Sequence, residues 1–210
     1  MRRAEIEKYE QLYGLGVKDR VHSLQKYDLF LHNVLPELAM EKLVKARLKT
    51  DPLVCIMDIG CGEGNALKEL KQKFKDSVHV TGVDLVRPEK LEGLDEFIRG
   101  DALNERLPEK QDIIVSFRAL HEIGHVEEMG KKIARCLGEG GVAVLSIRLQ
   151  ECCHGSLICI GDLTKDEVNF VVQLAHQHEW EHCKVTVYGT MLPYEHGRYL
   201  AGATIVLEKE

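Results

Sequence analysis

A glycine-rich turn joins an apolar run to a helical pattern, and its residue types could hold a ligand. The run Leu53-Val54-Cys55-Ile56-Met57-Asp58-Ile59 is followed directly by Gly60-Cys61-Gly62-Glu63-Gly64. Glycine permits positive φ and lets the backbone approach a ligand closely, while free amides at the start of the next helix favour a polar or anionic group. The turn therefore predicts a site that binds a small ligand largely through the main chain.

Acidic residues end the next two apolar runs along the chain. Asp84 closes the run 78–84, and Asp101 closes the run 96–101. A carboxylate at the first place can accept hydrogen bonds from a ribose diol, and one at the second can accept them from an exocyclic amine. Asp also commonly ends strands and caps helices. Together with Asp58, however, the acids end three successive strand patterns, which favours a binding site.

Two common nucleotide-binding motifs do not match this turn. The dinucleotide motif requires a glycine or alanine one position beyond Gly64, where Asn65 stands. The phosphate-binding loop requires a Gly-Lys-Ser/Thr sequence, and none follows. The ligand predicted here is therefore neither a dinucleotide nor a nucleoside triphosphate held by a P-loop.

Metal sites are a further kind of chemistry that the sequence suggests only weakly. The stretch His121-Glu122-Ile123-Gly124-His125 matches the zinc-protease motif formally, but that motif needs both histidines on one helix and Gly124 interrupts it. Two further groups lack the paired spacing of zinc sites, namely Cys152, Cys153, His154 and Cys159, and His176, His178, His182 and Cys183. We assign no metal, and a metal-dependent enzyme stays open as an alternative.

The segments that must position these residues alternate between strand and helix patterns. Apolar runs predict strands over 53–59, 78–84, 96–101, 112–117 and 140–147, and amphipathic patterns predict helices over 65–74, 126–137 and 164–178. This alternation implies right-handed crossovers and a parallel sheet. Two β-rich runs over 183–188 and 199–208 predict a closing antiparallel pair.

The first fifty residues differ from the rest of the chain. They carry ten Lys and Arg against seven Asp and Glu, in a chain whose net charge is -6. Their apolar residues recur at helical spacing, and we predict two or three helices broken near Gly14-Leu15-Gly16. Residues 1–50 are expected to form a helical cap or lid on a domain of residues 51–210, within a single compact unit.

Length and composition limit the classes of protein further. A chain of 210 residues with 44% hydrophobic and 30% charged residues suits one globular domain with a core. Its acidic balance counts against a dedicated nucleic-acid binder. No apolar run approaches the roughly 20 residues that span a bilayer, and the start has no secretory signal. We expect a cytoplasmic protein without membrane contact, the nucleus being the alternative location.

Taken in order, these motifs resemble those of the class I S-adenosylmethionine-dependent methyltransferases. The first motif of that family is similar to residues 56–64, and its ribose-binding acid is similar to Asp84. Its adenine-contacting stretch is similar to Gly100-Asp101-Ala102-Leu103, and its fourth motif is similar to residues 112–121. The resemblance covers about residues 53–148 and leaves the first fifty unmatched. It implies a Rossmann-like, doubly wound α/β fold with N-terminal helices. Its mostly parallel sheet would have seven strands, the last one antiparallel.

The resemblance also implies S-adenosyl-L-methionine as the cofactor and a role for individual residues. Ser116 and Phe117 would face its methionine portion, and Arg118 and His121 would be the polar side chains nearest the transferred methyl group. Arg118 could clamp a carboxylate or phosphate or form a surface ion pair, and His121 could act as a general base or have a structural role. The implied cofactor-binding residues are Asp58, Gly60, Cys61, Gly62, Asp84, Leu85, Asp101, Ala102, Ser116 and Phe117.

We expect the acceptor of the methyl group to be a small molecule. The fourth motif contains Ser116-Phe117-Arg118-Ala119 in place of the Asn/Asp-Pro-Pro-Tyr/Phe sequence associated with methylation of planar nitrogens. An RNA or protein methyltransferase that docks its substrate on the N-terminal helices is one alternative. A non-catalytic partner subunit is another, and the intact acids and glycines count against it.

Overall fold

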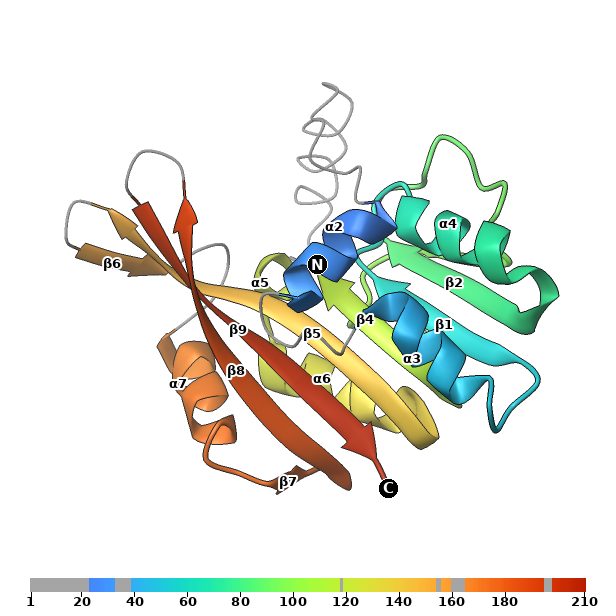
Figure 1. Ribbon diagram of the computed structural model, residues 1–210. Helices are drawn as coiled ribbons and strands as arrows, with labels where there is room; N and C mark the ends of the chain where they lie inside the picture. The colour runs from blue at the N-terminus through green and yellow to red at the C-terminus, as the bar shows by residue number, and fades with distance from the viewer. Residues whose placement is uncertain (1–22, 33–38, 118, 154–155, 160–164, 195–197) are drawn as a thin grey trace.

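The computed structural model describes residues 23–32, 39–117, 119–153, 156–159, 165–194 and 198–210, and a single twisted sheet runs through this part of the chain (Figure 1). Within it the sheet has nine strands in the order β3-β2-β1-β4-β5-β9-β8-β7, with β6 paired to β5. Helices cover both faces of the sheet. This is the doubly wound α/β arrangement that the sequence predicts.

The parallel half of the sheet places the glycine-rich turn. Its strands are β1 (Val54–Ile59), β2 (Val78–Asp84), β3 (Glu96–Arg99), β4 (Gln111–Phe117) and β5 (Leu137–Cys153). In the register, Ile56 of β1 lies opposite Val80 of β2 on one side and Ile113 of β4 on the other. The strand order reverses between β1 and β4, and ligands of open α/β sheets bind at the carboxyl ends of the strands at such a point.

The other half contains the antiparallel strand that the resemblance implies. Its strands are β6 (Ser156–Cys159), β7 (Glu179–Trp180), β8 (Cys183–Tyr194) and β9 (Arg198–Lys209). Because β9 is antiparallel to both β5 and β8, β8 runs in the direction of the parallel strands. The prediction of an antiparallel last strand is confirmed. The short strands β6 and β7 are additions to the seven that the resemblance implies.

Strand β5 is longer than the run 140–147 from which it is predicted. It continues to Cys153 because its far end has partners on both sides: Gln150 pairs with Cys159 of β6 and with Ala201 of β9. In Figure 1 this end of β5 projects beyond the helices together with β6, β8 and β9. Pairing of this kind depends on distant residues and leaves no local signal.

Side chains of each central strand alternate between two cores, one on each face. Ile113, Val115 and Phe117 of β4 belong to one core, whereas Ile114 belongs to the other. The first core is covered by α2 (Leu24–His32), α3 (Met40–Arg47) and α4 (Asn65–Phe74), and the second by α5 (Leu120–Ile123), α6 (Val126–Cys136) and α7 (Lys165–Leu174). A short 3-10 turn, η2 (Lys75–Ser77), follows α4.

The two described N-terminal helices pack directly on the first core. Tyr27 of α2 and Met40 and Val44 of α3 are buried there. The prediction of helices in this part of the chain is confirmed for these two. The break predicted near residues 14–16 lies outside the described residues. The boundary predicted at residue 50 between a helical cap and the main domain stays a prediction. No helix in the described ranges is both long and apolar enough to cross a membrane.

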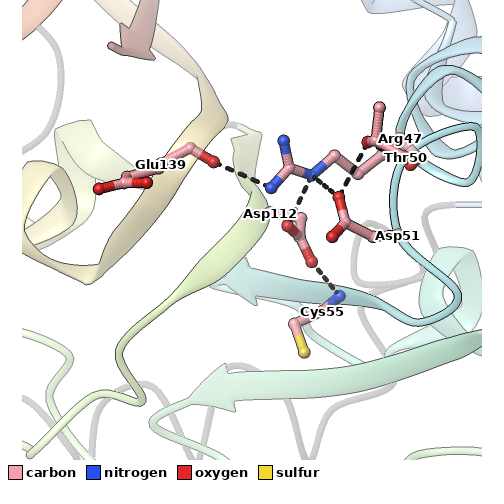
Figure 2. A network of polar contacts seen from close by, with 6 residues as sticks. All are labelled: Arg47, Thr50, Asp51, Cys55, Asp112 and Glu139. Carbon is pink, nitrogen blue, oxygen red and sulfur yellow. Dashed lines mark hydrogen bonds and ion pairs between the residues drawn. The ribbon is translucent and has the colours of Figure 1, made fainter.

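A network of polar contacts joins α3 to the start of the central strands (Figure 2). The Arg47 guanidinium donates from Nε to Asp112 Oδ1 at 2.8 Å and from Nη2 to the Glu139 carbonyl at 2.9 Å. The other oxygen of Asp112 accepts from the Cys55 amide at 2.7 Å. Asp112 and Cys55 stand near the amino ends of β4 and β1, so this network lies at the edge of the sheet opposite the glycine-rich turn.

Candidate functional site

The glycine-rich turn leaves the end of β1 in a conformation that favours glycine. Gly60, Gly62 and Gly64 have φ values of 78°, 57° and 69°. The amides of Gly60 and Cys61 donate to the Val83 carbonyl at 2.8 and 3.2 Å, which holds the turn against β2. On the other side, a Cβ on Gly60 would lie 2.2 Å from the Cβ of Ala119. The turn is therefore a cradle of main chain that no side chain at Gly60 could share.

Asp84 supports this cradle from the end of β2. The Gly62 amide donates to its Oδ2 at 2.8 Å, and the Val86 amide donates to its Oδ1 at 3.0 Å. Carboxylate oxygens accept hydrogen bonds from hydroxyl groups as well as from amides. The half-buried Leu85 follows directly in the chain. The structure thus brings Asp84 to the turn, and the ribose contacts of Asp84 and Leu85 remain predictions.

Asp58 lies beneath the turn, fully buried at 0% exposure. The Tyr27 hydroxyl, from α2, donates to its Oδ2 at 2.6 Å. Its other oxygen, Oδ1, is buried and has no hydrogen-bond partner among the described residues. Burial raises the pKa of the Asp58 carboxyl to about 7; the Tyr27 hydrogen bond opposes this rise and the charge of Asp84 adds to it.

Ser116 and Phe117, at the end of β4, lie on opposite faces of the sheet. The buried Ser116 hydroxyl donates to the Ile59 carbonyl at 2.9 Å and so joins the ends of β4 and β1. The buried Phe117 ring contacts the Tyr27 ring edge-on, with 4.4 Å between their centroids. Ser116 thus joins the base of the turn to β4, and Phe117 packs against the tyrosine that binds Asp58. Their contacts with a cofactor remain predictions.

Asp101 begins a turn after β3. Its Oδ1 accepts from the Leu103 amide at 3.0 Å and its Oδ2 from the Asn104 side-chain amide at 2.8 Å. The preceding Gly100 amide donates to the Asp84 carbonyl at 3.0 Å, which keeps this turn beside the end of β2. Ala102 is buried in the same turn. Asp101 therefore caps its own turn, and the adenine contact of Asp101 and Ala102 remains a prediction.

The two candidate catalytic residues follow β4. Arg118 lies outside the described residues, and the structure places only the backbone of His121, in the short helix α5. That helix ends at Ile123; Gly124 then has a φ of 65°, and His125 precedes α6 with a φ of 49°. The two histidines of the formal zinc-protease motif are thus on different segments. Across the described residues, no group of three or more His, Cys, Asp or Glu could hold a metal ion.

Tyr27 is the site residue that sequence reasoning missed. It stands 31 positions from Asp58, in a segment that matches none of the motifs. Helical spacing of apolar residues predicts the helix, but it does not say which of its aromatic residues covers the turn. The only local signal is a polar tip on an otherwise apolar side chain, since a buried Tyr hydroxyl usually finds a hydrogen-bond partner.

The fold and this site define a Rossmann-like α/β protein of the class I methyltransferase type. Within that class, residues 30–205 match the family described as "Methyltransferase domain". Because the match spans most of the chain, the protein belongs to this family. No curated protein sequence matches the chain significantly.

Solved structures with the same fold include several methyltransferases. A 1,6-didemethyltoxoflavin-N1-methyltransferase from Burkholderia thailandensis, with 1,6-didemethyltoxoflavin and S-adenosylhomocysteine bound, is 17% identical with a TM-score of 0.51 over 82% of this chain and 79% of that one. Coclaurine N-methyltransferase bound to N-methylheliamine and SAH is 14% identical, with a TM-score of 0.54 over 83% and 71%. TehB from Haemophilus influenzae is 17% identical, with a TM-score of 0.52 over 86% and 66%. At identities of 14–17%, these similarities show only that the fold is shared.

Proposed function

We propose that the protein is an S-adenosylmethionine-dependent methyltransferase whose acceptor is a small molecule. The observation that carries the proposal is the unpartnered, buried Oδ1 of Asp58 beneath a cradle of main chain. Buried polar atoms are usually hydrogen-bonded, so this oxygen calls for a donor from a ligand. S-adenosylmethionine offers an ammonium group on its methionine portion, which matches an acidic acceptor in both charge and hydrogen-bonding capacity.

The rest of the site suits the same ligand. The amides at the start of α4 favour a carboxylate, and the Asp84 carboxylate, which accepts from the Gly62 and Val86 amides, is a group of the kind that also accepts from ribose hydroxyls. The rings of Tyr27 and Phe117 pack against each other, and both side chains are buried. The hydrogen-bond donors and acceptors at these neighbouring strand ends therefore fit the amino-acid portion and the ribose of S-adenosylmethionine.

When bound, S-adenosylmethionine would supply a methyl group on a positively charged sulfur, and an electron pair of the acceptor would attack the methyl carbon as the bond from that carbon to the sulfur breaks. The protein's contribution is mainly alignment and the exclusion of water. The cradle and Asp84 orient the ligand, while Tyr27 and Phe117 exclude water from one side. If the acceptor must lose a proton, His121 is our candidate for the base and Arg118 for an anion clamp.

A small acceptor is favoured by the sequence and by the solved structures. The end of β4 lacks the Asn/Asp-Pro-Pro-Tyr/Phe sequence associated with planar nitrogens, and the net charge of -6 gives no general attraction for RNA. Two of the structures with this fold hold 1,6-didemethyltoxoflavin and N-methylheliamine, both small molecules. The cytoplasm is the location we propose for this activity.

The test combines cofactor binding with the transfer of a labelled methyl group. Titration calorimetry of the full chain with S-adenosylmethionine should show binding, and incubation with methyl-labelled S-adenosylmethionine should label a pool of metabolites but not pools of RNA or protein. Absence of binding at millimolar ligand would support a non-catalytic partner subunit. Label in the RNA or protein pool would overturn the small-molecule acceptor and leave the methyltransferase activity standing.

A further inference from the structure

Helix α2 contacts the site through the side chain of Tyr27. Tyr27 is 1% exposed; its ring packs against Phe117, and its hydroxyl meets Asp58 Oδ2 at 2.6 Å. The helix is held at its start by Glu69 of α4, whose Oε2 accepts from the Leu24 amide at 3.0 Å. Asp28, next to Tyr27, accepts from the Met40 amide at the start of α3 at 2.9 Å. The position of Tyr27 is thus fixed by neighbours on two helices.

The Tyr27 hydroxyl engages one oxygen of Asp58 and leaves the other without a partner among the described residues. A hydrogen bond to one oxygen of a carboxylate fixes the rotation of the whole group, because both oxygens lie in one plane. The unpartnered Oδ1 is therefore held in a fixed direction. Without the Tyr27 hydroxyl, the carboxyl would lose both this orientation and a donor that favours its charged form.

We propose that Tyr27 is a positioning residue of the cofactor site, which holds Asp58 charged and turned so that Oδ1 receives the ammonium group of S-adenosylmethionine. This inference rests on the proposed function and adds to it a residue from outside the family motifs. It also gives α2 a role: docking of this helix and binding of the cofactor's amino-acid portion favour one another, since both act on the same carboxylate.

The charges around the pair give the inference a pH dependence. Among the described groups, those that face it are Asp84 from β2 and Cys61 from the turn, and burial together with the charge of Asp58 raises the pKa of Tyr27 well above its ordinary value. Tyr27 therefore stays a donor at neutral pH. Burial raises the pKa of Asp58 to about 7, and the Tyr27 bond limits that rise. Removal of the hydroxyl should keep Asp58 protonated to a higher pH.

The experiment compares two ligands on wild type and Tyr27→Phe by titration calorimetry. S-adenosylhomocysteine has the ammonium group, whereas 5′-methylthioadenosine lacks the entire amino-acid portion. At about pH 7, Tyr27→Phe should bind S-adenosylhomocysteine about tenfold more weakly, the equivalent of one unit of pKa, and should bind 5′-methylthioadenosine as the wild type does. Between about pH 5.5 and 7.5, where an α-amino group stays largely protonated, the rise in affinity for S-adenosylhomocysteine should move to higher pH in the variant.

Tyr188→Phe is the matched control. It makes the same chemical change at a half-buried tyrosine of β8 that packs on the same core, and it should change neither affinity. A double-mutant cycle with Asp58→Asn gives a second test: once Asp58 is uncharged, Tyr27→Phe should have no further effect on S-adenosylhomocysteine. If Tyr27→Phe folds poorly, the wild type still tests the part of the inference that concerns Asp58 and the ammonium group, because only the affinity for S-adenosylhomocysteine should then depend on pH.

An equal loss of affinity for both ligands in Tyr27→Phe would overturn the inference and leave Tyr27 a packing residue. So would an unchanged affinity for S-adenosylhomocysteine, or an equal pH dependence of both ligands on the wild type. Failure of the wild type to bind either ligand would instead overturn the proposed function. The two failures are therefore distinguishable.

Discussion

At the scale of single residues, Asp58 combines two properties that destabilise a protein without a bound ligand. It is completely buried, and one of its two oxygens has no hydrogen-bond partner in the described part of the chain. Leaving a buried polar group unpaired costs about 1–3 kcal/mol, and more if the group is charged. A side chain that only filled space here would be apolar, so this cost is best explained by a ligand that pairs with the oxygen.

Asp58→Asn separates binding from stability. The amide keeps the shape of the side chain and can still accept from Tyr27, but it carries no charge for an ammonium group. We expect S-adenosylmethionine to bind at least tenfold more weakly, since hydrogen bonds to charged groups contribute about 1.5–3 kcal/mol. The free energy of unfolding without ligand should rise at pH 8 by about 1–3 kcal/mol, because no charge is then buried. Calorimetry and urea unfolding measure the two effects.

The exposed Asp76 in η2 provides the comparison for this substitution. Asp76→Asn should leave both the affinity and the unfolding free energy within about 0.5 kcal/mol of wild type, as is usual at the surface. An Asp58→Asn protein that binds the cofactor normally would contradict the assignment of Asp58 to the site, whatever its stability.

At the scale of elements, the sequence predicts best those whose signal is local. Helix α4 and strand β2 have the predicted bounds, 65–74 and 78–84, because an amphipathic period and an apolar run bounded by polar residues are read within one segment. The end of β5 and the whole of β6 depend on pairing between Gln150 and Cys159, which no single segment encodes. The residues of the candidate site differ in the same way. The glycines and acids are predictable because they stand at the ends of apolar runs, whereas no local pattern predicts the position of Tyr27.

The Arg47 network gives a prediction about how α3 is attached (Figure 2). Arg47→Ala removes the partner of Asp112 Oδ1, a group only 11% exposed, along with the contact to the Glu139 carbonyl. We expect the free energy of unfolding to fall by about 1–3 kcal/mol, since it leaves a largely buried acceptor unpaired. Cofactor affinity should not change, because the network lies at the other edge of the sheet. Urea unfolding and calorimetry test the two statements.

Lys45→Ala in the same helix is the control for Arg47→Ala. Its ion pair with Glu41 is 3.6 Å long and 62% exposed on the lysine side, and such surface pairs contribute about 0.2–1 kcal/mol. Similar destabilisation by both substitutions would show that Arg47 acts as an ordinary surface charge. A loss of cofactor affinity in Arg47→Ala would show that α3 transmits its position to the turn.

At the scale of the whole molecule, the candidate site unites elements that are far apart in the sequence, from α2 to the end of β4. The first core contains Tyr27 of α2 as well as Phe117 of β4, and Tyr27 contacts both Phe117 and Asp58. A ligand that pairs with Asp58 therefore stabilises the contact of α2 with the sheet and not only the turn. Stability of the entire fold should accordingly respond to the ionisation of this one carboxyl group.

The direction of that response follows from the pKa of Asp58, which burial raises to about 7. An unfolded Asp has a pKa of about 3.9, so between these values the folded protein holds a proton that the unfolded chain has lost. The stability that this proton confers is fully present below about pH 4, falls as the pH rises, and is gone above about pH 7.

We therefore expect the free energy of unfolding of the protein without ligand to fall, relative to that of Asp58→Asn, by roughly 2–4 kcal/mol between pH 4 and pH 8. Urea unfolding of both proteins across this range measures the difference, and the variant removes the contribution of every other titrating group. Saturating S-adenosylhomocysteine should flatten the wild-type curve, because its ammonium group holds Asp58 ionised in the folded state. If the unfolding free energies of the two proteins without ligand instead changed in parallel with pH, Asp58 would be ionised in the folded protein over this whole range. Groups other than a bound cofactor would then stabilise its charge.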